Sequence, residues 1–303
     1  MTPEDVLSHP ARVLTQKQRE FYVENGYVTV EGAISPEWLD RLRAVNAEMI
    51  EKGRAVERSN DVYILEDGHS FETPRLRRIT NPVTHHPVYW EFASESASAD
   101  VAADVVGPDV KFYHSKLNFK WAKGGQDFKW HQDVQAWPHT NYSPVTIGLY
   151  IDDCDMEQGP LIVARGSHNG PLHSMYDAHG NWVLNIPKEK LPSEETWDYL
   201  TGPAGTLVLL NCRTVHGSLR NESPRSRPFL LNVYSSADAF PYRPNPLPNP
   251  YEGAIVRGQP ARWAHHDPRP CEIPPDWSSG YSGPWAHQKG AASGAAAAKG
   301  DDY

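Results

Sequence analysis

The sequence predicts a mainly β protein with flanking helices, built as a sandwich, jelly roll or barrel. Its 303 residues are 39% hydrophobic and 22% charged, which is typical of a globular chain with a full core. Helical patterns occur in the first hundred residues. From about Lys111 onward, short apolar runs alternate with Gly, Pro, Asn and Asp, as in chains where turns join many strands.

The first helix is expected to begin at Thr15. Thr15 and Gln18 have the spacing of a capping box, in which each side chain accepts a bond from the other residue's backbone N–H. Asn25 and Gly26 should end this helix. The next four residues, YVTV at 27–30, have the composition of a strand.

A second helix should begin at Ser35 and Pro36, since proline is favoured in the first turn of a helix. Apolar residues then recur at steps of three and four, which gives one buried stripe. They are Leu39, Leu42, Val45 and Met49. This pattern predicts a packing helix and implies no chemistry.

The strand region contains the runs VKFYHSKLNFKW, VTIGLYI, PLIVA, GTLVLLN and RPFLLNVYSS. A long polar insert at 167–205 interrupts them, and such inserts often cover a binding mouth. We expect one domain over residues 1–303, with a helical flank at 1–100 and a β core at 108–240 that contains the insert. The segment 241–303 should run extended over the surface and end in a disordered low-complexity tail.

Composition excludes several classes of partner. Three widely spaced cysteines suggest neither a disulfide framework nor a CxxC zinc site, and they fit a reducing cytoplasm. The N-terminal residues lack the apolar stretch of a secretion signal, and no run is long enough to span a bilayer. A net charge of -9 argues against a nucleic-acid partner.

The run FKWHQDVQAW places His131 and Asp133 two residues apart. On a strand, such residues project from the same face, so an imidazole and a carboxylate converge. A third ligand is available in His216, which follows the apolar strand GTLVLLN. Two histidines and one carboxylate form the facial triad of non-haem Fe(II) oxygenases, which leaves open positions for a keto acid and O2.

An HxD pair alone is a weak signal, and Arg227 strengthens it. Arg227 opens the run RPFLLNVYSS eleven residues after His216, where its guanidinium could hold the distal carboxylate of 2-oxoglutarate with two hydrogen bonds. Ser218, two positions after His216, could add a hydroxyl donor to that carboxylate.

From about residue 14 to 239 the sequence resembles the phytanoyl-CoA dioxygenase family of Fe(II)/2-oxoglutarate enzymes, and within it the ectoine hydroxylases. The motifs that carry the resemblance are TQKQREFYVENGYVTVEGAI, F-x-W-H-x-D-x-x-x-W, QGPLIVARGSH and H-G-S followed by arginine. The resemblance implies a double-stranded β-helix (jelly-roll, cupin-like) fold. It also implies that Fe(II), 2-oxoglutarate and O2 are used to hydroxylate a small metabolite, with release of succinate and CO2.

The resemblance matches Lys120 to a family lysine near the co-substrate, and Asn118 is assigned to the co-substrate with it. We expect the primary substrate to contact Trp137, His114, Lys116 and Gln135. Ectoine hydroxylases would have arginine at Lys116, glutamine at His114 and an aromatic residue at Leu231. These departures predict an altered substrate pocket, and the substrate could be polar or zwitterionic.

Other functions remain open at this stage. The same cofactor chemistry could give desaturation, epimerisation or cyclisation. The chain could also be a non-catalytic jelly-roll module with a vestigial metal site, but the joint presence of the triad and Arg227 would then be a coincidence. A zinc hydrolase with the same ligands would leave Arg227 without a role. The chain is expected to act as a monomer or homodimer.

Overall fold

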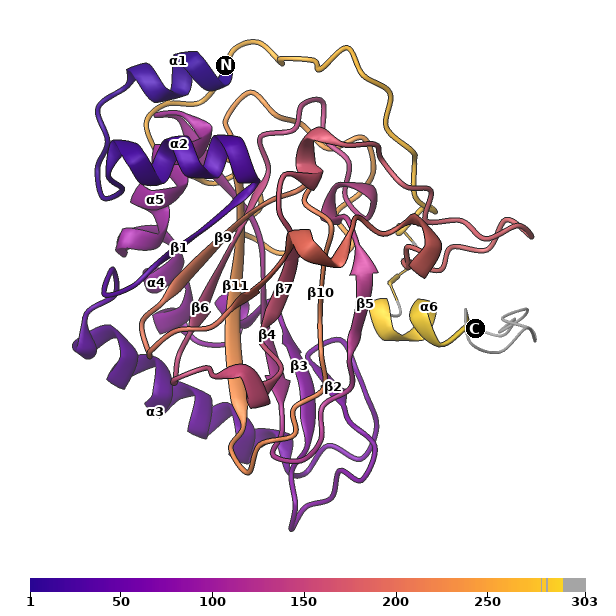
Figure 1. Cartoon of the computed structure of the whole chain (residues 1–303). Coiled ribbons are helices and arrows are strands. Elements are labelled where there is room, and N and C mark those ends of the chain that lie inside the picture. Colours follow the sequence, from indigo (N-terminus) through magenta and orange to yellow (C-terminus); the bar gives the residue numbers. More distant parts are fainter. Residues whose placement is uncertain (279, 282, 291–303) are drawn as a thin grey trace.

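The strands form two antiparallel sheets, and helices cover the outer face of the larger one, in a mixed α/β arrangement (Figure 1). The structure is a computed structural model that describes residues 1–278, 280–281 and 283–290. The predicted low-complexity tail from residue 291 onward lies outside the described residues. None of the described helices has the length and apolar character needed to cross a bilayer.

Six α-helices occur among the described residues: α1 (Pro3–Ser8), α2 (Gln16–Asn25), α3 (Pro36–Gly53), α4 (Pro87–Glu95), α5 (Ala97–Val106) and α6 (Pro284–Gly290). The predicted capping box at Thr15 and Gln18 is present, and Gly26 ends α2 with a φ of 81°, which glycine adopts without strain. Ser35 caps α3 by accepting a hydrogen bond from the backbone N–H of Trp38. The sequence did not predict α1, α4, α5 and α6.

The larger sheet has the strand order β1-β9-β6-β11-β4-β3-β2, with β12 also paired to β4. Its strands are β1 (Tyr27–Val30), β2 (Tyr63–Leu65), β3 (Leu76–Thr80), β4 (Val110–Lys120), β6 (Val145–Tyr150), β9 (Leu207–Asn211), β11 (Arg227–Ser236) and β12 (Ile255–Arg257). The first hundred residues therefore supply three strands as well as helices. Only β1 was predicted among these three, because β2 is three residues long and β3 contains two arginines.

The smaller sheet has the order β5-β10-β7-β8. Its strands are β5 (Phe128–His131), β7 (Leu161–Ala164), β8 (Trp197–Leu200) and β10 (His216–Ser218). Strand β8 lies within the predicted polar insert at 167–205. The insert also places Trp182, Leu184 and Ile186 in a buried cluster, so much of it packs inside the molecule.

Alternation along the central strands separates two cores. On β11, Leu230 packs with α3 and α5 residues on the helix side, whereas Phe229 packs with β7 and β8 residues between the sheets. On β6, Ile147 and Tyr150 divide in the same way. A strand buried on both faces has a continuous apolar sequence, as seen in VTIGLY. The space between the two sheets is where the predicted site residues meet.

Candidate metal and co-substrate site

His131 and His216 lie side by side on neighbouring strands of the smaller sheet. His131 ends β5, His216 begins β10, and the two are direct partners in the antiparallel pairing of these strands. Their ring centroids lie 4.1 Å apart. Strand pairing therefore brings together two histidines that are 85 residues apart in sequence.

Asp133 does not lie on the strand, which corrects the expected reason for its convergence with His131. The strand ends at His131, and Asp133 begins a 3-10 turn, Asp133–Gln135. The backbone N–H of Val134 donates to the carbonyl of Cys212 at 2.9 Å, outside the strand ladder. The turn directs the carboxylate back toward both imidazoles. Asp133 therefore does approach His131 as predicted, but it does so from a turn and not from the same face of a strand.

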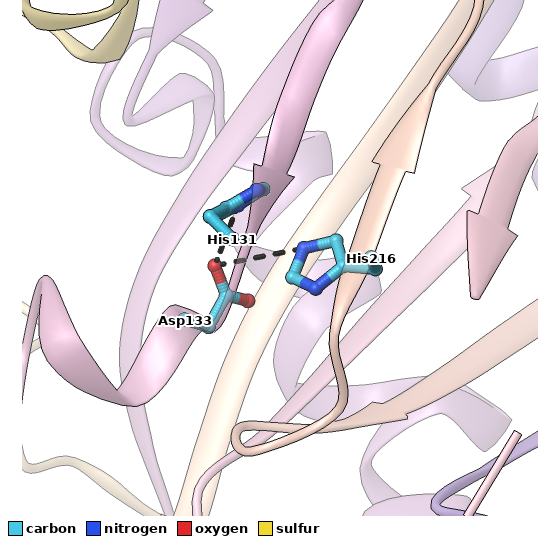
Figure 2. A group of neighbouring side chains, drawn as sticks. All are labelled: His131, Asp133 and His216. Carbon is cyan, nitrogen blue, oxygen red and sulfur yellow. Dashed lines mark ion pairs between the residues drawn. The ribbon is translucent and has the colours of Figure 1, made fainter. Parts of the chain in front are cut away.

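The three side chains present their ligand atoms to one point (Figure 2). Oδ1 of Asp133 lies 3.5 Å from Nε2 of His131 and 3.9 Å from Nε2 of His216. One ligand atom from each residue lies within 4.8 Å of the others, and this is the one such His/Cys/Asp/Glu group found among the described residues. All three residues are buried.

The hydrogen bonds of the two imidazoles fit a metal site. Nδ1 of His131 lies 2.9 Å from the carbonyl oxygen of Lys129, and Nδ1 of His216 lies 2.9 Å from that of Thr214. Because a carbonyl can only accept, each Nδ1 carries the proton and each Nε2 exposes a lone pair toward Asp133. Two lone pairs facing a carboxylate repel it unless a cation lies between them. The donor set therefore fits Fe(II).

The pKa shifts of the ligands agree with this arrangement. Burial would raise the pKa of Asp133, but its contacts with His131 and His216 and the charge of Lys116 outweigh burial and lower that pKa. Burial is the main cause that lowers the pKa of His216 to about 3, against the opposing effect of Asp133. An ionised carboxylate and a neutral imidazole are the forms that bind a metal. Thr146 Oγ1 donates to Asp133 Oδ2 at 2.8 Å and orients the carboxylate.

Arg227 lies in the same cavity and has unused donors. The cavity has an empty volume of about 870 Å³ and is lined by the three ligands together with Arg227, Lys120, Asn118 and Ser218. Arg227 is 4% exposed, and its Nε and Nη1 have no hydrogen-bond partner among the residues that the structure describes. Buried donors of this kind indicate a missing acceptor. A carboxylate with two oxygens matches the guanidinium fork.

The other predicted co-substrate residues surround Arg227. Lys120 is its direct partner in the β4–β11 pairing and donates from Nζ to the carbonyl of Leu219. Burial, followed by the charge of Arg227, lowers the pKa of Lys120 well below its usual value. Asn118 accepts a hydrogen bond from Arg78 Nε at 2.8 Å. Ser218 lies on β10 two residues after His216, as expected from the sequence.

Three of the four predicted substrate residues line a second, smaller cavity that shares His131 and Asp133 with the first. These are Trp137, His114 and Lys116. Gln135 lines neither cavity: it is fully buried and donates to the backbone carbonyl of His173. Trp137 also belongs to a buried apolar cluster, so it serves as both core and cavity wall.

Sequence reasoning missed Arg78, Thr146 and Trp285. Arg78 lies on the short strand β3 and lines both cavities. Its only sequence signal is a charged residue within LRRIT. Trp285, on α6, packs against Arg78 with the guanidinium carbon 4.6 Å from a ring centroid and also lines the larger cavity. No local pattern connects these residues with the triad, because only the folded sheet brings them together.

Comparisons with known proteins agree with the site. The chain is 30% identical over 273 residues to a probable alpha-ketoglutarate-dependent hypophosphite dioxygenase from Stutzerimonas stutzeri, covering 86% of this chain and 91% of that protein. It is 24% identical over 265 residues to an ectoine dioxygenase from Sphingopyxis alaskensis, covering 82% and 85%.

A solved structure with the same fold is EctD from S. alaskensis with bound Fe, with a TM-score of 0.60, 23% identity and coverage of 86% of this chain and 89% of that one. The carbocyclase SnoK from nogalamycin biosynthesis matches with a TM-score of 0.60 and 22% identity, covering 76% and 88%. The family model described as phytanoyl-CoA dioxygenase (PhyH) matches residues 22–229. The chain therefore belongs to the phytanoyl-CoA dioxygenase family, whose members are iron- and 2-oxoglutarate-dependent dioxygenases.

Proposed function

We propose that this chain, as a single dioxygenase domain with a double-stranded β-helix, hydroxylates an unactivated C–H bond of a small polar or zwitterionic metabolite. One 2-oxoglutarate and one O2 would be consumed per turnover, with release of succinate and CO2, and Fe(II) would stay bound as the cofactor. One observation carries the proposal: the three ligand atoms and the unpartnered donors of Arg227 open onto the same cavity. Two relatives are named for small polar compounds, hypophosphite and ectoine.

Each side chain of the site has a distinct role in this proposal. Bound Fe(II) and 2-oxoglutarate supply the oxidising chemistry. His131, Asp133 and His216 hold the metal, and the Nδ1–H groups of the histidines fix their rings by donating to backbone carbonyls. Arg227 binds the distal carboxylate of the keto acid with its free guanidinium donors, and Ser218 lies near enough in the cavity wall to assist.

The test is anaerobic addition of Fe(II) and 2-oxoglutarate to the purified protein. A weak visible charge-transfer band is expected, because the keto acid would bind Fe(II) at the positions that the facial triad leaves open. His131→Ala should abolish the band. Arg227→Met should shift its formation to roughly 30- to 100-fold higher 2-oxoglutarate concentration, since hydrogen bonds to a charged group contribute about 2–3 kcal/mol. Arg227→Lys should recover part of the loss. Absence of the band in the wild-type protein contradicts the proposal.

A second outcome of the same chemistry is desaturation, epimerisation or cyclisation. Two structural neighbours are titled as a carbocyclase and an epimerase. The mass of the product separates the outcomes: hydroxylation adds one oxygen, desaturation and cyclisation remove two hydrogens, and epimerisation leaves the mass unchanged.

The unpartnered donors of Arg227 also favour an oxygenase over a vestigial binding module or a zinc hydrolase. A binding module releases no succinate with any substrate. A hydrolase stays active without O2, whereas the proposed enzyme stops. Size-exclusion chromatography distinguishes a monomer from a homodimer.

A further inference from the structure

Two basic side chains lie beside the metal ligands on neighbouring strands. Arg78 on β3 pairs with Asn118 on β4, and Thr80 on β3 pairs with Lys116. The two cations are therefore separated by two register positions along the same pair of strands. Both line the larger cavity and also the smaller one, where His131 and Asp133 form part of the wall. They therefore lie where the two cavities meet.

No acidic side chain neutralises this pair. Within the described part of the chain, neither Arg78 nor Lys116 has a carboxylate partner within 4.0 Å, although the partly buried Arg75 has one in Glu66. Arg78 is 3% exposed, and its hydrogen-bond partner among the described residues is the neutral amide of Asn118, at 2.8 Å. Burying a charge without a counter-charge is costly, which indicates that an anion binds there.

The nearby carboxylate of Asp133 does not serve as that counter-charge. Its Oδ2 accepts from Thr146, and its Oδ1 faces the two imidazoles. Fe(II) at +2, Asp133 at −1, 2-oxoglutarate at −2 and Arg227 at +1 sum to zero, and Lys120 adds no negative charge, so the loaded metal and co-substrate site carries no net negative charge. Arg78 and Lys116 then remain as an uncompensated positive pair.

Apart from the metal ligand Asp133, the other walls of the smaller cavity carry no charge. Its empty volume is about 400 Å³, and its walls include Ala136, Trp137, Leu184 and Leu247. Burial lowers the pKa of His114 well below its usual value, so this histidine is uncharged at neutral pH. A small compartment with apolar walls and two cations at one end suits a compact molecule with one acid group.

We propose that the primary substrate is a small oxyanion, a carboxylate or a phosphorus oxyacid, whose acid group pairs with Arg78 and Lys116 in the smaller cavity. This inference rests on the proposed oxygenase function. The acid group fixes the orientation of the substrate, and the rest of the molecule lies against the apolar wall next to the metal ligands. Trp285 and Tyr281 of the C-terminal segment cover Arg78 and the cavity, so the ion pair is shielded from water.

The test measures anion binding directly, by calorimetry on the anaerobic protein loaded with Fe(II) and 2-oxoglutarate. The probes are propionate, hypophosphite and methylphosphonate, each compared with a neutral compound: propionamide, or dimethyl methylphosphonate for the two phosphorus acids. At least one anion is expected to bind about tenfold or more tightly than its neutral counterpart. Propionate against the phosphorus oxyanions distinguishes the two acid types. Equal binding of anions and neutral compounds, or no anion binding, overturns the inference.

Loss of the charge-transfer band tests a different claim. Without the band, the proposed oxygenase function fails and the inference fails with it. With the band present and no preference for anions, only the inference fails, and the metal and co-substrate assignment stands.

Variants locate the binding groups. Arg78→Gln and Lys116→Met should each weaken anion binding by about tenfold or more, whereas Lys116→Arg keeps the charge and should restore most of it. Lys52→Met on α3, an exposed lysine paired with Glu48, is the control and should change nothing. Should Arg78→Gln bind the anion normally and instead require far more 2-oxoglutarate to form the band, the cations serve the co-substrate and the inference is overturned. Lys116→Arg keeps the test valid if the neutral variants fold poorly.

Discussion

Thr146 shows how a single residue outside the triad can tune the metal. Its hydroxyl donates to the Asp133 oxygen that does not face the histidines, so the other oxygen is left for the metal. Such partners of metal ligands fix geometry and basicity, and their loss typically costs 10- to 100-fold in metal affinity. Sequence alone gave no reason to choose this threonine.

We expect Thr146→Val to weaken Fe(II) binding by roughly 10- to 100-fold, because the carboxylate loses its orienting donor while the side-chain volume is kept. Anaerobic titration of Fe(II), followed by the charge-transfer band, measures the change. Thr146→Ser retains the hydroxyl and should bind Fe(II) nearly as the wild-type protein does. Unchanged affinity in the valine variant would show that the turn alone holds Asp133.

The metal ligands themselves were predictable from sequence, whereas the walls of the two cavities were predicted only in part. HxD and a distal HGS have a fixed local spacing, and Arg227 opens a recognisable strand. Arg78, Lys116 and Trp285 come from three separate elements and have no common pattern. Lys116 was expected to contact the substrate because it alternates with His114 toward one face of a strand beside the metal strand. Gln135 was also expected to contact the substrate, but it lies in the 3-10 turn and lines neither cavity.

At the level of elements, strand β10 sets the separation of the two histidines. It lies between β5 and β7, and Gly217 is its central residue. A Cβ at Gly217 would lie 2.9 Å from the backbone oxygen of Phe128 on β5. Since a backbone atom cannot rotate away, glycine is what allows β5 and β10 to approach closely enough for both imidazoles to share one ion.

Gly217→Ala should therefore push β10 away from β5 and lower Fe(II) affinity more than it lowers overall stability. Paired measurements are the Fe(II) titration and the thermal unfolding temperature of the metal-free protein. A large loss of metal affinity with a small change in unfolding temperature is expected. Wild-type Fe(II) affinity in this variant would show that the small sheet absorbs a methyl group without moving the histidines.

Long, strongly patterned elements were the ones that sequence predicted well. Helices α2 and α3 carry their own capping residues, β6 and β9 are nearly continuous apolar runs, and β4 and β11 are long runs rich in apolar and aromatic residues. Strands β2, β3 and β8 were missed because each is short and is held mainly by pairing with distant segments. Tertiary pairing, rather than local propensity, determines these strands.

Across the whole molecule, several buried histidines are held neutral. Burial lowers the pKa of His139 to about 4, and it lowers those of His114 and His168 as well. In the unfolded chain, histidine takes up a proton near pH 6.5. Between that pH and the lower folded values, the unfolded state binds more protons, so stability is greatest above pH 6.5 and falls as the pH decreases.

The free energy of unfolding should thus decrease steadily from pH 7 to pH 5, by up to about 1.4 kcal/mol per pH unit for each such histidine. Urea unfolding at pH 7, 6 and 5 measures this slope. His139→Phe should reduce the slope, because the ring is packed among Tyr113 and Trp137 and no longer titrates. A stability that is flat over this pH range would contradict the assignment of these histidines as neutral.

Helix α6 and the residues before it reach the active site from the far end of the polypeptide, beside β5 (Figure 1). The iron-binding framework and this covering segment are thus encoded in separate stretches of the gene. Substituting residues 277–290 offers a way to change which compounds are accepted while the three metal ligands and Arg227 are kept.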